Sequence, residues 1–193
     1  MERTLLLERA FIFEADHDKG FRKLRDNQFP RAEQGIVHEP IANALDQQEG
    51  DDPIEITLKN HGAHHKLTYR DNGEGLTFQN LEALHFIGKT TKRPFRSEKI
   101  GRFGMGLAGA FNRRLGVFRV EIESCVCGKP SRIVYDCGGE GTPLWWSEPL
   151  RDAECGGLSI SFFFPSSRLP EIETALSVFL DKTIVPVRFN GEL

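Results

Sequence analysis

The chain has 193 residues, of which 39% are apolar and 27% are charged, and its formal net charge is -3. These proportions are typical of a soluble globular domain and exclude a disordered chain. No apolar run approaches the roughly 18 residues that span a bilayer. Glu2 and Glu8 flank the apolar start of the chain and no small-residue cleavage site follows, which excludes a signal peptide. The net negative charge gives no global electrostatic case for binding nucleic acid.

The four cysteines lack the spacing of a structural zinc site. Cys125 and Cys127 alternate along an expected strand, and Cys137 and Cys155 stand apart from them. No pair shows the C-x-x-C spacing that zinc sites use. We therefore expect reduced thiols, in a protein of the cytoplasm or, in a eukaryote, of the nucleus.

The N-terminal part of the chain predicts two helices. Residues 18–27 indicate a short helix that ends before Pro30. Residues 32–48 carry apolar side chains at helical spacing, which predicts a second, amphipathic helix. Pro40 lies inside it, where proline costs about 3 kcal/mol unless it occupies the first turn. We expect this helix either to be kinked at Pro40 or to begin near Val37.

Strands become frequent after this helix. The expected elements are strands at 54–58, 66–70, 117–122, 132–135, 158–164 and 184–189, turns at 61–64 and 128–131, a loop at 71–75, and helices at 77–86, 105–113 and 170–182. Helices mixed with antiparallel hairpins predict an α+β fold, with helices on one face of a mixed, mainly antiparallel sheet in a two-layer sandwich.

One domain is expected to span residues 1–193, with residues 1–30 as a candidate N-terminal strap or dimerisation segment. Asn190-Gly191 follows the last expected strand, and Asn-Gly is a strong hairpin signal. Because a hairpin that turns and then ends suggests that more chain follows, we expect this to be the N-terminal part of a longer protein.

Two glycine-containing patterns resemble nucleotide-binding motifs but lack their structural context. Gly88-Lys89-Thr90 matches the end of a P-loop, yet Ala83 stands where the first glycine belongs and the residues between are bulky. Gly104 to Gly109 fits G-x-G-x-x-G, with Glu123 about where a ribose-binding acid would stand. That motif must follow a buried parallel strand, whereas residues 96–102 are highly charged, which argues against a dinucleotide site.

Three separate segments have polar or glycine-rich patterns, and their combination is more informative about function than any one of them. Glu39, Asn43 and Asp46 project from neighbouring positions of the second helix, because residues four apart share a helix face. The segment Asp71 to Gly75 follows a strand, and Gly101 to Leu107 ends at an expected helix start. Taken singly, they could be a solvated helix face, a plain turn and a tightly packed helix start.

Together these segments resemble the GHKL ATPases, the superfamily of gyrase, heat-shock chaperones, histidine kinases and MutL that shares the Bergerat fold. His38 to Asp46 resembles the family's N-box, E-x-x-x-N-A-x-D. Asp71 to Gly75 matches its D-x-G-x-G motif, and Ile100 to Leu107 resembles its lid motif, I-G-x-F-G-x-G followed by Leu or Phe. The motifs occur in the family's order, and the resemblance covers roughly residues 35–164.

The resemblance implies a role for each motif residue. Asp71 would accept a hydrogen bond from the exocyclic amine of adenine, and Gly73 and Gly75 would let the backbone approach the base. Asn43 would bind Mg²⁺ through its carbonyl oxygen, and Glu39 would be the general base that orients the attacking water.

The remaining residues of the implied ATP site lie on the same helix and in the lid. Asp46 belongs to the N-box. Lys92 or Lys99 could reach the phosphates as point charges. The lid residues, whose amides and helix start would bind the phosphates, are Gly101, Arg102, Phe103, Gly104, Met105, Gly106 and Leu107.

Three features depart from the family's pattern. Pro40 directly follows Glu39, the implied base, and could alter the direction in which the Glu39 side chain points. Gly156-Gly157-Leu158 stands where the family often has Gly-Thr, so a hydroxyl is missing that a water could replace. The segment 88–99 shows neither helix nor strand periodicity, so we expect a loosely ordered lid and slow hydrolysis.

The resemblance favours an ATPase over a kinase. Histidine kinases of this fold generally lack the base that Glu39 supplies, and the lid text is closest to the MutL, MORC and heat-shock chaperone branch. By analogy, we expect Mg²⁺-dependent ATP binding and slow hydrolysis that drive lid closure and a conformational change or homodimerisation of a larger protein. In that protein, further C-terminal domains would be the only route to nucleic acid. The alternative is an ATP-binding switch that does not hydrolyse, which Pro40 favours, or an interaction module.

Overall fold

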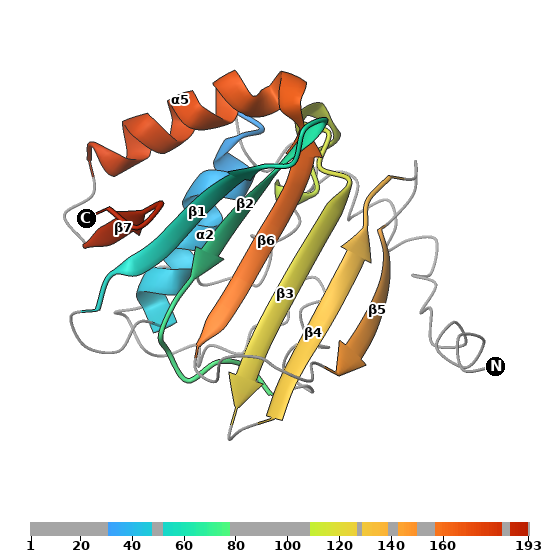
Figure 1. The fold of residues 1–193 in the computed structure, drawn as a ribbon, viewed down its shortest axis with the longest axis vertical. Coiled ribbons are helices and arrows are strands. Elements are labelled where there is room, and N and C mark those ends of the chain that lie inside the picture. The colour runs from blue at the N-terminus through green and yellow to red at the C-terminus, as the bar shows by residue number, and fades with distance from the viewer. Residues whose placement is uncertain are drawn as a thin grey trace.

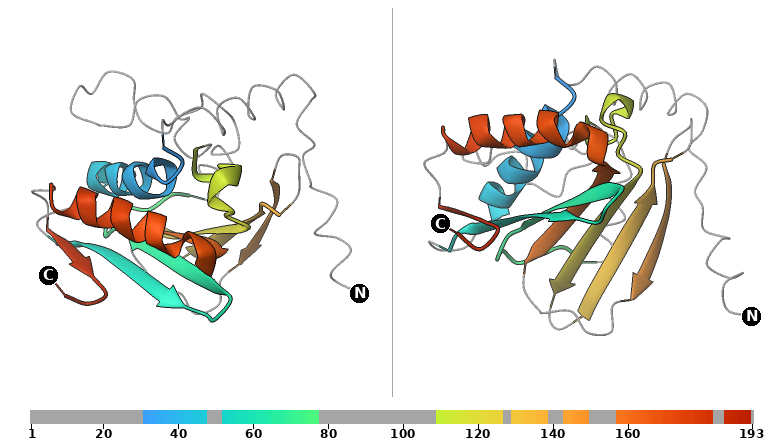
Figure 2. Two further views of the ribbon diagram at one scale, coloured as in Figure 1. Left: turned by 90° about the horizontal axis from the view of Figure 1, so that it is seen from above. Right: turned by 45° about the horizontal axis from the view of Figure 1, so that its top comes forward.

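The computed structural model describes residues 31–47, 52–77, 109–126, 129–138, 143–149, 157–182 and 186–192. Within these residues, two α-helices lie on one face of a seven-stranded sheet (Figures 1 and 2). The α+β, two-layer architecture expected from the sequence is therefore confirmed.

The sheet is mixed and mainly antiparallel. Its strands are β1 (Ile54–Asn60), β2 (His64–Arg70), β3 (Arg119–Val126), β4 (Lys129–Asp136), β5 (Leu144–Pro149), β6 (Leu158–Pro165) and β7 (Val187–Phe189). Their order across the sheet is β5-β4-β3-β6-β2-β1-β7. Only the β1–β7 pair is parallel among the described pairs. The crossover of β6 into the centre brings residue 158 beside the end of β2, which matters for the site below.

The hairpin between β1 and β2 forms where the sequence predicts it. Gly62 and Ala63 form the two-residue loop, and the amide of His61 donates to the carbonyl of His64 at 2.9 Å. Gly62 has φ +80°, a left-handed conformation that suits glycine. The Asn60 side chain accepts a hydrogen bond from the Gly62 amide at 2.7 Å, which closes the turn.

The core lies between the sheet and the helices α2 (Gln34–Gln47) and α5 (Leu169–Leu180). Strand residues alternate, so one set of side chains in each strand faces the helices. The largest fully buried members include Leu67, Tyr69, Phe162 and Phe164 from the sheet and Ile36 and Ile41 from α2. The rings of His38 on α2 and Phe179 on α5 are 5.0 Å apart, so the two helices also contact each other.

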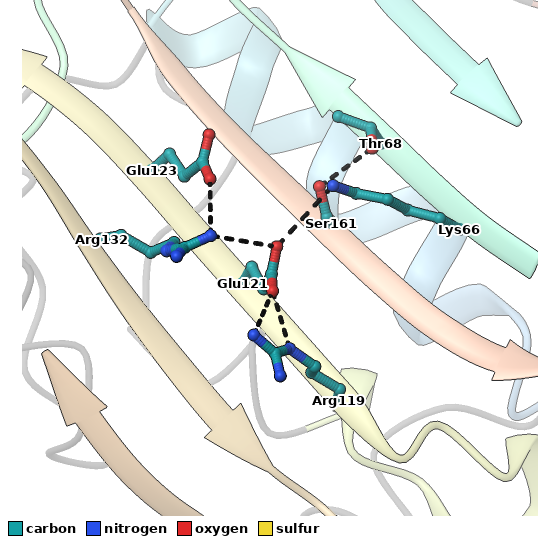
Figure 3. A network of polar contacts seen from close by, with 7 residues as sticks. All are labelled: Lys66, Thr68, Arg119, Glu121, Glu123, Arg132 and Ser161. Carbon is teal, nitrogen blue, oxygen red and sulfur yellow. Dashed lines mark hydrogen bonds and ion pairs between the residues drawn. The ribbon is translucent and has the colours of Figure 1, made fainter. Parts of the chain in front are cut away.

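The opposite face of the sheet carries a polar network centred on Glu121 (Figure 3). The Glu121 residue is only 6% exposed. Three cations from three strands surround its carboxylate: Arg119 at 2.6 Å, Lys66 at 3.7 Å and Arg132 at 3.9 Å. A buried carboxylate is costly unless it is paired, and this arrangement compensates its charge on a face that the helices do not cover.

The helix α2 corrects one expectation about its boundary. It begins at Gln34, so the alternative start near Val37 is wrong. A turn at residues 31–33 leads into it, and the helix continues through the buried Pro40 to Gln47.

Other boundaries also differ from expectation. The strands β3 and β4 extend to Val126 and from Lys129, so the expected turn at 128–131 is too long. Arg113 belongs to a separate 3-10 helix, Arg113–Leu115, rather than to a helix at 105–113. The strand β5 was not expected, because its segment shows no alternation. The expected helices at 18–27 and 77–86 lie outside the described residues, apart from Thr77.

The last strand ends in the expected tight turn. Asn190 and Gly191 have φ of 49° and 92°, and Phe189 pairs with Glu192 across them. Two consecutive left-handed residues are the requirement of the type I′ hairpin turn that Asn-Gly favours.

Two further expectations concern cysteines and membranes. Cys125 and Cys137 form no disulfide within the described residues, whereas Cys127 and Cys155 lie outside them. In the part of the chain that the structure describes, no helix is long and apolar enough to cross a bilayer.

Candidate nucleotide site

The Asp71 side chain is fixed at the end of β2 by two backbone amides. Its Oδ1 accepts hydrogen bonds from the amides of Gly73 and Leu158, each at 3.0 Å. The Asp71 amide in turn donates to the carbonyl of Leu158 at 3.0 Å. Both side-chain bonds go to Oδ1, and no described residue donates to Oδ2. The carboxylate is thus held in one orientation while one of its oxygens stays available as an acceptor.

The close packing around Asp71 depends on Gly157. This glycine has φ +72°, and a Cβ placed on it would collide with the carbonyl oxygen of Asp71, 2.7 Å from the carbonyl carbon and 3.1 Å from Cα of Asn72. A real Cβ essentially never comes within 3.0 Å of a heavy atom of a residue that is not its neighbour in the chain. The absence of a side chain at residue 157 therefore lets β6 begin directly against the backbone of Asp71.

The loop after Asp71 is docked on β3. Gly75 has φ +73°, and a Cβ there would lie 2.7 Å from Oγ of Ser124 and 2.9 Å from the carbonyl oxygen of Gly157. The Ser124 hydroxyl accepts a hydrogen bond from the amide of Leu76 at 2.7 Å. Gly73 is buried as well. The two glycines of the D-x-G-x-G motif thus keep the backbone close to the sheet beside the carboxylate.

Burial dominates the electrostatics of Asp71. The residue is 5% exposed. Burial raises the pKa of its carboxyl group above the usual value, and the amides of Leu158 and Gly73 and the charge of Arg70 oppose this only in part. A buried carboxylate with one oxygen to which no described residue donates is an acceptor for a buried N–H donor, such as the exocyclic amine of a purine.

The helix α2 presents Glu39 and Asn43 as a hydrogen-bonded pair. Nδ2 of Asn43 donates to Oε1 of Glu39 at 3.2 Å, across one helical turn. Both side chains are partly buried. The helix packs against β1, β2 and β6, and it runs in the same general direction as β2 (Figures 1 and 2). Its C-terminal half and the end of β2 that leads into Asp71 therefore lie toward the same end of the sheet.

The donor set on α2 fits a nucleotide-bound magnesium ion. Mg²⁺ usually takes one or two protein oxygens and completes its octahedron with water and substrate phosphates. With Nδ2 of Asn43 turned to Glu39, the amide carbonyl oxygen is the atom that would bind the metal. Among the described residues, no group of three His, Cys, Asp or Glu side chains could hold a metal by itself.

The structure describes part of the expected site, on two separate elements, and the rest lies outside the described residues. Glu39 and Asn43 lie on α2, and Asp71, Gly73 and Gly75 on the loop after β2. The backbone of Asp46 belongs to α2, but its side chain lies outside the described residues. Also outside them are Lys92, Lys99, Gly101, Arg102, Phe103, Gly104, Met105, Gly106 and Leu107.

Three residues of the site were not assigned a role from the sequence. Gly157 and Leu158 were noted only for a missing hydroxyl, although a pair of glycines before a strand could have indicated a close backbone approach. Ser124 is a buried polar residue on the helix-facing side of β3, and a polar residue among inward-facing apolar positions is the signal that could have found it.

This combination of a two-layer α+β sandwich, a helix bearing a Glu–Asn pair and a buried aspartate before a glycine loop defines the class of GHKL-type ATPase domains. Residues 31–167 match the family described as histidine kinase-, DNA gyrase B- and HSP90-like ATPase. The chain belongs to this family, as the sequence motifs predict.

A curated relative is a much longer protein than this chain. The chain is 30% identical over 117 residues to the B subunit of type 2 DNA topoisomerase 6 from Pyrococcus horikoshii. The similarity covers 57% of this chain and 19% of the relative, so the chain corresponds to about a fifth of that protein.

Proposed function

We propose that this domain binds ATP with Mg²⁺, with the adenine amine on Asp71. The observation that carries the proposal is the one-sided pairing of the Asp71 carboxylate. Two amides hold Oδ1, and Oδ2 has no donor among the described residues. An ionised carboxylate can only accept, so it matches the amine of adenine and not the O6 acceptor of guanine.

ATP selectivity gives the most specific test of the base pocket. Calorimetric titration with ATP and with GTP, both in excess Mg²⁺, should show binding of ATP and at least tenfold weaker binding of GTP. Equal affinities for the two nucleotides would remove Asp71 from base recognition. No binding of either would contradict the proposed function itself.

We further propose that the domain hydrolyses ATP slowly, with Glu39 as general base. The Asn43 amide holds Oε1 of Glu39, and Oε2, to which no described residue donates, would accept a proton from the attacking water. General base catalysis of this kind contributes about 10²–10⁴-fold. Orientation and charge stabilisation by the surrounding residues supply most of the remaining acceleration in phosphoryl transfer.

The Glu39→Gln variant separates an ATPase from a switch. It should keep MgATP affinity and lose turnover by at least about 10²-fold, while Glu173→Gln on the exposed side of α5 should change neither. Wild-type turnover at the level of Glu39→Gln would instead favour the ATP-binding switch that does not hydrolyse. The buried Pro40 directly after Glu39 is the feature that favours this alternative, because it restrains the backbone that aims the base.

Closure of the lid and homodimerisation form the last part of the proposal. They rest on the resemblance to the MutL, MORC and chaperone branch and on the similarity to a topoisomerase component, which suggests a role within a larger assembly. Sedimentation at several protein concentrations with a non-hydrolysable ATP analogue should show a dimer that is absent without nucleotide. A monomer at every protein concentration would contradict the proposal that this chain dimerises.

A further inference from the structure

Gly35 makes a backbone-to-backbone contact that no other residue could make. A Cβ on Gly35 would collide with the carbonyl oxygen of Gly109, would lie 2.5 Å from its carbonyl carbon and 3.1 Å from the amide nitrogen of Ala110. All three atoms are backbone, so none can rotate away as a side chain would. Any side chain at residue 35 must therefore move α2 and residues 109–110 apart.

The segment on the other side of the contact is firmly anchored. The carbonyl of Gly109 accepts a hydrogen bond from the amide of Asn112 at 3.2 Å. The Asn112 side chain is buried and accepts a hydrogen bond from the amide of Arg114 at 3.0 Å. Ala110 and Leu115 are 1% and 0% exposed. Because both sides of the contact belong to the core, an added methyl group cannot be absorbed by a loop.

The contact lies on the functional face of α2. Residues 35, 39 and 43 are spaced by four and so project from one side of the helix. Gly35 therefore meets Gly109 one turn, about 5.4 Å, before Glu39 and two turns before Asn43. Gly109 itself follows the glycine-rich motif by two residues in the sequence, since that motif ends at Leu107.

We propose that Gly35 is a positioning residue, which sets the separation between α2 and the segment that follows the glycine-rich motif. It thereby fixes where Glu39 and Asn43 stand relative to the nucleotide phosphates. This inference rests on the proposed function. It concerns the phosphate end of the nucleotide, whereas the contacts around Asp71 concern the base.

The Gly35→Ala variant tests this position, with AMP as a probe of the base pocket alone. The variant should bind MgATP at least tenfold more weakly and turn it over at least tenfold more slowly, while its affinity for AMP changes less than threefold. Gln34→Ala, one residue earlier on the same helix, is the matched control and should leave all three quantities unchanged. A purely structural defect would weaken AMP and MgATP binding together.

The variants also give a clear contrary result. Alanine is the better helix former, so a glycine that merely sits in a helix would yield a more stable Gly35→Ala protein with unchanged nucleotide parameters, and this would overturn the proposal. If wild type binds MgATP and Gly35→Ala behaves as Gln34→Ala does, only the positioning role fails. If wild type binds no ATP, the proposed function fails and the positioning role with it.

A measurement on the wild-type chain covers the case in which Gly35→Ala does not fold. Backbone NMR should show a nuclear Overhauser effect between Hα of Gly35 and the amide proton of Ala110. The backbone resonances of both residues should change their chemical shifts on addition of MgATP and keep them on addition of AMP. The proposal would be overturned if MgATP changed the chemical shifts of residues around Asp71 but not those of Gly35 and Ala110.

Discussion

Asp71 and Leu158 are joined by two hydrogen bonds of 3.0 Å, one of which runs to a side chain. The Asp71 amide donates to the Leu158 carbonyl, as in an ordinary antiparallel ladder. The Leu158 amide, however, donates to Oδ1 of Asp71. The carboxylate thus takes the place of a backbone carbonyl in the sheet, and β2 and β6 together fix the group that we assign to base recognition.

Gly157→Ala should disrupt this relationship. The new methyl group would overlap the carbonyl of Asp71 at a left-handed φ of +72°, so we expect a loss of about 2–4 kcal/mol in the free energy of unfolding and loss of ATP binding. Gly62→Ala is the control, because it has φ +80° but nothing within 4 Å. It should cost about 1–2 kcal/mol from the backbone alone. Urea denaturation compares the two, and equal losses would mean that the packing against Asp71 is unimportant.

Tyr69→Phe should stabilise the protein. The Tyr69 hydroxyl is buried and has no hydrogen-bond partner among the described residues, and burial raises the pKa of the phenol well above its usual value. Removing an unsatisfied buried hydroxyl should raise the free energy of unfolding by about 1 kcal/mol. Tyr135→Phe should not raise the free energy of unfolding in this way, because the buried Tyr135 hydroxyl is not left without a hydrogen-bond partner. A destabilised Tyr69→Phe in thermal unfolding would show that the hydroxyl has a partner, such as a fixed water.

Glu121→Gln should destabilise the open face of the sheet. The Glu121 side chain is 7% exposed and meets three cations that are 25–38% exposed, so solvent screening reduces the expected loss to about 1–2 kcal/mol. Glu123→Gln, with a side chain 39% exposed and one described ion pair to Arg132, should lose about 0.5 kcal/mol or less. Denaturation at low and high salt would measure the loss in the free energy of unfolding for each of the two variants. An equal effect for both would contradict the central role of Glu121.

The fold was predictable from the sequence because its signals are local. Apolar spacing marks α2 and α5, and alternation with Gly62-Ala63 and Asn190-Gly191 marks the hairpins. β5 was missed because LWWSEP lacks alternation, and its strand state depends on pairing with β4. The N-box and D-x-G-x-G motifs predicted the family, which the family match confirms, while the roles of Glu39, Asn43 and Asp71 remain a proposal.

Some parts of the site depend on contacts between distant segments. Leu158 meets Asp71 only because β6 crosses into the centre of the sheet. Gly35 meets Gly109 only through helix packing. No local pattern encodes either distance, so the sequence alone could not predict these contacts.

The stability of the protein should depend on pH through Asp71. Burial raises its folded-state pKa above the unfolded value, so the folded chain binds a proton more readily than the unfolded chain. The stabilising contribution of protonated Asp71 is complete below the unfolded pKa and is lost as the pH rises through the folded pKa. Relative to Asp71→Asn, wild type should therefore become less stable as the pH rises from about 4, the ordinary pKa of the carboxyl group, through the higher folded-state pKa. A difference that does not vary with pH in denaturation experiments would contradict the raised pKa.

The most direct test of the central claim measures unfolding and MgATP binding on one preparation of Asp71→Asn at neutral pH. Asparagine keeps an Oδ1 for the amides of Gly73 and Leu158, removes a buried charge, and replaces the free acceptor with a donor. We predict a free energy of unfolding equal to or above that of wild type, together with MgATP affinity lowered at least tenfold by calorimetry. A variant that is as stable as wild type and binds MgATP equally well would contradict the assignment of Asp71 as the adenine-binding residue.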